Sequence, residues 1–383
     1  MCSPRPQPRN KERRNMNSMH KGMGQRLRGL LLAALWIATA FGPHPARADT
    51  LRVGVVGDTG IGERAYHPGF AAVQQALTAE KPDVLLHLGD FVYQPRIFPD
   101  ACDPRYLQEI RATLVEPFPQ RLFVVGDNDL PPVKWKPKAS GCWAGIDPLD
   151  SPLEETPQGE SAPGLYEGST VIGNTMFALL NSFPWTDPTP WLKPRIDRAR
   201  AQGLWVIVGV HEPAITTAWY IEKRATQLAR INALEPDLVF SGNQHSYERF
   251  HPIGRPREDG SLPVTKSADG IYRRGQGTVH IITGGGGARL KPFADFQDNP
   301  EHTAPPEVFE ALAARALMNH FLLLEIGDRS LKGTTFRVCA PPPPGDTADP
   351  RWKPDRKVWR TVALECDGKP PGISIYDRFQ IDR

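Results

Sequence analysis

Residues 51–60 read LRVGVVGDTG, a short apolar run that ends in a Gly-Asp turn at Gly57 and Asp58. Four more apolar runs end in a similar way, each followed at once by side chains that can bind a metal ion. These runs and their endings are LLHL followed by GDFVY (89–93), LFVV followed by GDND (126–129), VIVGV followed by HEP (211–213), and LVF followed by SGNQH (241–245).

Short apolar runs alternate with helical patterns along the chain, and continuous β-branched runs are typical of strands buried on both faces. Strands are expected at residues 51–56, 84–88, 122–125, 176–180, 205–210, 238–240, 278–282 and 321–326. Helices are expected at residues 70–80, 104–115, 192–202, 222–234 and 307–318. This alternation predicts stacked α/β layers around a largely parallel core.

The polar endings of the five runs are expected to meet. In open α/β sheets, ligands bind beyond the carboxyl ends of the strands. A single Gly-Asp after a strand is usually a turn or a helix cap, but five such loops in one order favour a shared metal site. Oxygen and imidazole donors without thiolate suit Fe, Mn or Zn.

The series of motifs resembles the calcineurin-like metallophosphoesterase superfamily, and in detail its purple acid phosphatase branch. That branch is known by GDxG, GDxxY, GNH followed by an acid, VxxH and GHxH. This chain has GDTG, GDFVY, GDND, VGVH and GNQH in the same order. The resemblance covers residues 51–338 and implies a layered αββα sandwich with a metal centre at the C-terminal ends of the strands.

The resemblance implies two metal ions bridged by Asp90. The first, usually ferric iron, would be bound by Asp58, Asp90, Tyr93 and His245. All four residues are present in this chain, so this half of the centre is expected to be intact.

The second metal position departs from the family pattern. The resemblance implies Asp90, Asp127, His211 and Asn243 as its ligands, but Asp127 replaces a family Asn and Asn243 replaces a family His. Both changes favour oxygen donors, so Mn²⁺ or Mg²⁺ is favoured over Zn²⁺. The candidates for this position are Mn, Fe, Mg and Zn.

A third departure concerns proton transfer. The family His that contacts phosphate, and that is a candidate proton donor to the leaving group, is replaced by Asn128. Loss of a general acid typically slows a reaction by about 10²–10⁴-fold. The predicted catalytic positions are Asn128, Asp127 and His211. The candidate replacement acids are Asp129, Glu212 and His67.

The function expected from these residues is hydrolysis of a small-molecule phosphate ester by a phosphomonoesterase similar to acid phosphatases. Two alternatives remain open. One is a weak or inactive protein that binds a single metal ion and serves as a scaffold, and the other is a phosphodiesterase.

Two further features are interpreted as structural. His87 lies inside an apolar run and is expected to be packed in the core rather than to bind metal. The run Gly284–Gly287 fits neither a Walker nor a dinucleotide-binding pattern, and is expected to form a turn packed under the metal centre.

The first 48 residues are predicted to be a signal peptide. Basic residues precede an apolar run at 29–41, and Ala46 and Ala48 place small residues at the cleavage positions. The run is short for a membrane span, so no stable anchor is expected, although an uncleaved anchor is the alternative. The predicted location is periplasmic or secreted.

Cysteine usage agrees with export, and the charge of the body argues against nucleic acid as a partner. Residues 49–383 hold 37 basic and 42 acidic side chains, so the body is mildly acidic and nucleic acid is not an expected partner. The turn-rich loops around the cysteines predict two disulfides, Cys102–Cys142 and Cys339–Cys366, with a structural zinc site as the competing interpretation.

The predicted organisation is therefore one catalytic domain with flanking segments. The metallophosphoesterase domain is expected at residues 49–340 and includes an inserted loop at 130–168. A Pro-rich extension follows at 341–383, and its alternating apolar residues are expected to add an edge strand.

Overall fold

The computed structural model of the chain divides into two compact units, residues 1–46 and 47–383. It describes residues 50–59, 68–91, 104, 108, 110–131, 134, 154–155, 167–288, 290–339 and 372–383, all of which belong to the second unit. The predicted signal peptide and most of the predicted inserted loop lie outside these residues. Among the described helices, none is both long and apolar enough to cross a bilayer.

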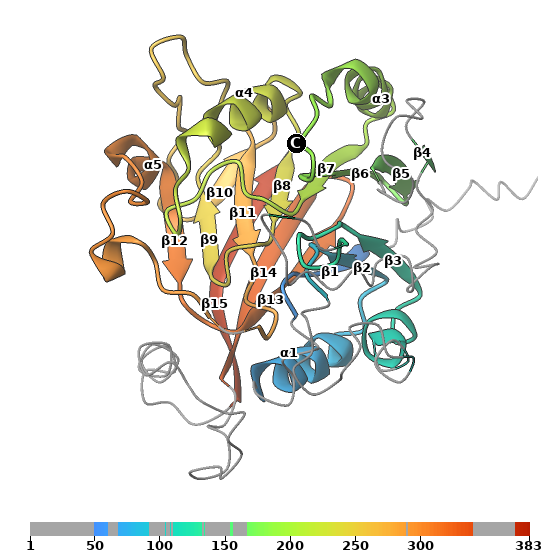
Figure 1. The fold of residues 1–383 in the computed structure, drawn as a ribbon. Coiled ribbons are helices and arrows are strands. Elements are labelled where there is room, and N and C mark those ends of the chain that lie inside the picture. The colour runs from blue at the N-terminus through green and yellow to red at the C-terminus, as the bar shows by residue number, and fades with distance from the viewer. Residues whose placement is uncertain are drawn as a thin grey trace, which may run out of the picture. The chain divides into compact units, whose positions relative to one another are not determined.

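Two mixed β-sheets form the centre of the second unit (Figure 1). The first has the strand order β10-β15-β14-β13-β1-β2-β3. Its strands are β10 (Ile271–Arg273), β15 (Gly372–Asp382), β14 (Ser330–Cys339), β13 (His320–Ile326), β1 (Leu51–Val56), β2 (Val84–His87) and β3 (Gln120–Phe123).

The second sheet has the order β12-β9-β11-β8-β7-β6-β5-β4. Its strands are β12 (Leu312–Ala316), β9 (Tyr247–Phe250), β11 (Val279–Thr283), β8 (Leu238–Ser241), β7 (Trp205–Val210), β6 (Thr175–Leu180), β5 (Gly168–Ile172) and β4 (Glu154–Glu155). Parallel strands form one end of the first sheet, β1-β2-β3, and the middle of the second sheet, β6-β7-β8-β11.

Alternation of side chains along the strands explains the layers. In β1, Val55 packs into a core shared by both sheets, whereas Val56 points to the opposite face. In β6, Phe177 joins the shared core and Met176 faces outward. Because successive strand residues face opposite sides, a continuous apolar run fills two cores at once.

Helices cover both outer faces. Residues of α1 (Pro68–Ala79) and of the π-helical turn Arg111–Val115 pack on the outer face of the first sheet. On the second sheet, α3 (Thr189–Ala201) and α4 (Ala225–Ala233) do the same (Figure 1). The arrangement is the αββα sandwich that the family resemblance implies.

Two predicted elements need correction. The helix expected at 307–318 ends early, because α5 covers only Pro306–Ala311 and the chain becomes extended at Leu312 to form β12 beside β9. Pairing with β9 therefore prevails over a local pattern that is compatible with a helix. The C-terminal strand β15 forms as expected, but it lies between β14 and β10 rather than at the edge.

The disulfide predicted between Cys339 and Cys366 is not formed. Cys339 is the last residue of β14 and is a free, buried thiol, packed as small apolar side chains are. The other predicted partners, Cys102, Cys142 and Cys366, lie outside the described residues.

Candidate metal centre

Three strand-end turns of the site have an unusual backbone. Asp58 follows β1, Asp90 follows β2 and Asn243 follows β8, and their φ angles are 54°, 56° and 63°. Positive φ is rare outside glycine, and Asp and Asn tolerate it better than most other residues. Such backbone conformations gather at functional sites, where the surrounding structure maintains them.

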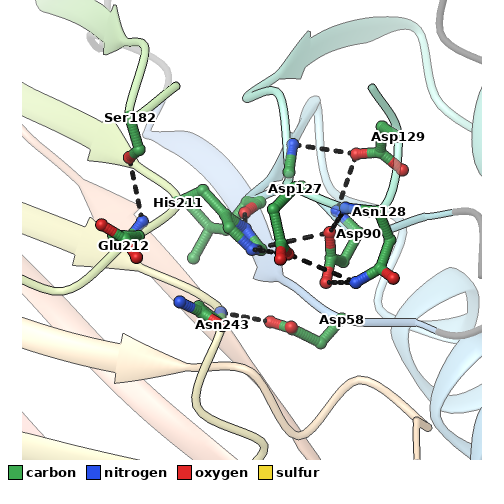
Figure 2. Close-up of polar contacts among 12 residues, drawn as sticks. Asp58, Asp90, Asp127, Asn128, Asp129, Ser182, His211, Glu212 and Asn243 are labelled. Atoms are coloured by element: carbon green, nitrogen blue, oxygen red, sulfur yellow. Dashed lines mark hydrogen bonds and ion pairs between the residues drawn. The ribbon is translucent and has the colours of Figure 1, made fainter. Parts of the chain in front are cut away.

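The turns bring Asp58, Asp90 and His211 together. One potential ligand atom from each of these buried residues lies within 4.8 Å of the others. Figure 2 shows the three side chains at the centre of the site, with Asp127 beside His211. His211 Nε2 is 3.5 Å from Asp90 Oδ1 and 3.6 Å from Asp127 Oδ1.

The environment of His211 fits a metal ion. Its Nδ1–H donates a hydrogen bond to the carbonyl oxygen of Leu88 at 2.6 Å, which aims Nε2 at the carboxylates. Nε2 is buried and has no hydrogen-bond partner among the described residues. Burial alone would lower the pKa of His211, but the charge of Asp90 and the other carboxylates raises it to about 10. The carboxylates thus stabilise a positive charge at Nε2, which either a proton or a metal ion can supply.

Asp58 is held on two sides. Its Oδ2 accepts a hydrogen bond from the backbone amide of Asn243 at 2.8 Å, and its Oδ1 lies 3.3 Å from His245 Nε2. Burial alone would raise the pKa of Asp58, but the hydrogen bond and charge of His245 hold it below the usual range. Asp58 is therefore an ionised oxygen donor in the interior.

The loop after β3 surrounds Asp90. The backbone amide of Asn128 donates to Asp90 Oδ1 at 2.9 Å, and its side-chain amide donates to Asp90 Oδ2 at 2.6 Å and to Asp127 Oδ1 at 3.3 Å. Burial, with the charges of Asp127 and Asp58, raises the pKa of Asp90 to about 6. Asn128 thereby offsets repulsion between two neighbouring carboxylates.

Asp129 and Glu212, two of the candidate replacement acids, have other partners. Asp129 Oδ2 accepts the backbone amides of Asp90 and Gly126 at 2.8 and 2.9 Å, so it braces the two turns. Glu212 forms an ion pair with Arg224 at 3.0 Å. His67, the third candidate, lies outside the described residues.

Most of the predicted ligand set lies in one place. Asp58, Asp90 and His211 cluster, Asp127 and His245 adjoin them, and Asn243 contacts Asp58 through its backbone. Tyr93 lies outside the described residues. The sequence does not predict that Asp129 connects two turns or that the carbonyl of Leu88 orients His211. Hydrogen bonds to the backbone leave no sequence motif.

His87 is a packed core residue, as predicted. It is fully buried, stacks on Phe123, and contacts the hydroxyl of Thr59 at 3.1 Å. Burial lowers the pKa of His87 to about 3, so its imidazole is neutral and supports the turn that carries Asp58.

The sequence profile of calcineurin-like phosphoesterases matches residues 51–247, half of the chain, and the chain belongs to this family. An uncharacterised Mycobacterium tuberculosis protein, Rv2577, is 33% identical over 106 residues, which cover 25% of this chain and 20% of that protein. Probable inactive purple acid phosphatase 24 of Arabidopsis thaliana is 25% identical over 287 residues, which cover 66% of this chain and 44% of that protein.

The fold is shared with a solved purple acid phosphatase. The structure of the enzyme PPD1 from yellow lupin (Lupinus luteus) seeds has a TM-score of 0.59 at 16% identity, covering 89% of this chain and 55% of that chain. The matches cover less than half the length of the two curated relatives. The chain is thus a member of the calcineurin-like phosphoesterase family whose fold is shared with a purple acid phosphatase.

Proposed function

We propose that this protein is a metal-dependent phosphomonoesterase whose second metal position is altered. The observation that carries the proposal is the convergence of Asp58, Asp90 and His211, with the buried Nε2 of His211 directed at carboxylates and lacking a hydrogen-bond partner. A buried imidazole and several carboxylates in contact favour a bound cation over a purely structural cluster.

The residues divide between two positions. Asp58, Asp90 and His245, with Tyr93, would hold the first metal ion, for which we propose iron. Asp90, Asp127, His211 and Asn243 would hold the second. When bound, such ions neutralise charge on a phosphoryl group and make water a better nucleophile. The residues of this chain fix where that group binds and how it is oriented.

The altered residues are expected to slow turnover. Asp127 adds a negative charge beside Asp90, which opposes the approach of a phosphate ester. Asn128 cannot donate a proton to the leaving group, and its amide already bonds to Asp90 and Asp127. Esters whose leaving group needs no protonation, such as aryl phosphates, are therefore the expected substrates.

The direct test is hydrolysis of an aryl phosphate after loading with Fe²⁺ or Mn²⁺. Asp90→Ala should abolish activity, whereas Asp197→Ala, which removes an exposed carboxylate of α3, should leave it unchanged. Circular dichroism of both variants checks that the fold persists. Activity that survives Asp90→Ala would rule out this centre as the source.

A second candidate function is a one-metal scaffold without useful activity. The hydrogen bonds from Asn128 to both carboxylates favour it, and the Arabidopsis relative is named probably inactive. Elemental analysis separates the two proposals, because the scaffold holds one metal ion and the enzyme holds two. The triple variant Asp127→Asn, Asn128→His and Asn243→His should raise phosphatase activity strongly if the fold retains its catalytic capacity.

We also propose that the protein is exported. The basic and apolar leader, with Ala46 and Ala48 at the cleavage positions, supports this. The N-terminal sequence of protein recovered from outside the cytoplasm should begin just after Ala48. Recovery of the intact leader on a membrane fraction would instead support an uncleaved anchor.

A further inference from the structure

The glycine run Gly284–Gly287 packs directly against the turn that carries Asp58. The backbone amide of Gly286 donates to the carbonyl of Gly57 at 3.0 Å, and that of Ala288 donates to the carbonyl of Asp58 at 2.9 Å. A Cβ at Gly284 would lie 2.1 Å from the carbonyl oxygen of Gln244, so a side chain has no room there. The segment that follows the run is thereby brought to the metal centre.

That segment presents Lys291 at the site. Its neighbours Leu290 and Phe293 are buried in a small apolar cluster with Ala218 and Leu317, which fixes the backbone. The side chain of Lys291 is exposed, and its Nζ donates to the carbonyl of Asn243 at 3.2 Å.

The contact with Asn243 ties the ammonium to Asp58. The amide of Asn243 donates to Asp58 Oδ2, so one residue links the ammonium to the carboxylate. The positive charge of Lys291 therefore lies beside the loop whose backbone binds Asp58.

The carboxylates around the centre explain why a phosphate group bound here would need a cationic side chain. Asp58, Asp90 and Asp127 give the centre several carboxylates, while Asn128, at the position of the phosphate-contacting family His, uses its amide on two of them. Lys291, by contrast, contacts a neutral carbonyl and is open to solvent.

Two arginines among the described residues near these loops are engaged with acids. Arg224 pairs with Glu212, and Arg315 pairs with Asp295. An exposed ammonium that contacts only a carbonyl oxygen among the described residues can turn toward an anion at little cost, because no ion pair has to break.

We propose that Lys291 binds the phosphoryl oxygens of the substrate and takes over the anchoring role that Asn128 does not perform. The inference rests on the proposed function of the centre. It names a substrate-binding residue contributed by the segment after β11, outside the five motif loops.

Titration calorimetry with inorganic phosphate on the metal-loaded protein tests the proposal. Lys291→Met should weaken phosphate binding about tenfold or more, as loss of a charge-assisted hydrogen bond does. Lys291→Arg should retain affinity within about threefold, because it keeps the charge. The control is Lys332→Met. Lys332 is an exposed residue of β14 that lies across from Glu325 of β13, at the end of the first sheet that is remote from Asp58.

Kinetics with an aryl phosphate supply the second measurement. KM should rise in Lys291→Met by a factor similar to the loss of phosphate affinity, with a smaller change in kcat. Equal phosphate affinity in Lys291→Met and the parent protein overturns the proposal, as does a parent protein that binds no phosphate.

The outcomes separate the two proposals. Phosphate binding that depends on Lys291 in a protein without hydrolytic activity supports the anchoring role and contradicts the enzyme. Hydrolysis with unchanged KM and phosphate affinity in Lys291→Met supports the enzyme and contradicts the anchoring role.

Discussion

His211 Nδ1 lies 2.6 Å from the carbonyl oxygen of Leu88, and this contact joins two strand ends of different sheets. Leu88 begins the turn that delivers Asp90, so the same turn supplies one carboxylate and orients the imidazole beside it. Metal-binding histidines commonly use the second ring nitrogen in this way. The orientation of His211 is thus set by the backbone before any ion binds.

His211→Ala should remove metal from the protein. The change deletes the nitrogen that faces Asp90 and Asp127, and so removes the imidazole donor proposed for the second metal position. Elemental analysis should show the loss of about one metal ion per chain if one position depends on this imidazole. His302→Ala is the matched control, because His302 is stacked on Trp219 rather than placed among the carboxylates. Equal metal content in both variants would contradict the assignment.

Gly284→Ala should destabilise the protein and disturb the centre together. A Cβ at this position would lie 2.1 Å from the Gln244 carbonyl oxygen and 2.7 Å from Asp58 Oδ2. We expect a loss of about 3 kcal/mol in the free energy of unfolding, measured by urea denaturation. The control is Gly327→Ala, whose Cβ would lie 3.5 Å from the nearest neighbouring atom, the carbonyl oxygen of Ser330. This variant should change the free energy of unfolding by less than about 0.5 kcal/mol. Equal effects would show that the close packing of the glycine run is unimportant.

Glu167→Gln should alter the dependence of stability on pH. Burial raises the pKa of Glu167 to about 7, and the hydrogen bond from Trp191 opposes the increase only partly. Between pH 4.5 and 7 the folded protein then holds a proton that the unfolded chain releases, so this contribution to stability is present at low pH and is lost as pH rises.

Because Glu167 is only partly buried, the gain in Glu167→Gln at pH 8 should be on the order of 1 kcal/mol. At pH 4.5 the variant and the parent should have similar stability. Thermal unfolding across this range is the measurement, and parallel curves for the two proteins would contradict the raised pKa.

Asp377→Asn should weaken the attachment of β15. Asp377 accepts hydrogen bonds from Arg249 Nε at 2.6 Å and Nη2 at 3.0 Å, and from the hydroxyl of Tyr247 at 2.7 Å. Removing the charge leaves the buried guanidinium of Arg249 uncompensated, which costs about 3 kcal/mol. Glu235→Gln, which breaks an exposed ion pair with Arg255, should cost less than about 1 kcal/mol. Urea denaturation compares the two variants.

The parts that could be predicted are those that depend on local sequence. Apolar runs that end in Gly-Asp identify β1 and β2 and place Asp58 and Asp90 at their ends. The continuous apolar run of β7 likewise places His211 at the carboxyl end of the parallel strands.

The parts that could not be predicted depend on distant partners. Residues 312–316 are compatible with a helix until β9 is available as a neighbour. The inner position of β15 requires knowledge of β10, which pairs with it in parallel. Lys291 belongs to no sequence motif. Its position near Asp58 follows from the packing of the glycine run against the turn of Asp58, which the sequence does not reveal.

The position of β15 has a consequence for synthesis of the chain on the ribosome. Among the described strands, β10 pairs only with β15, yet β10 ends at Arg273 and β15 begins at Gly372. A nascent chain therefore carries β10 and one side of β14 without partners while the intervening residues are translated, and during that interval both are open to wrong pairing. Completion of the first sheet is a late event that follows emergence of residues 372–382.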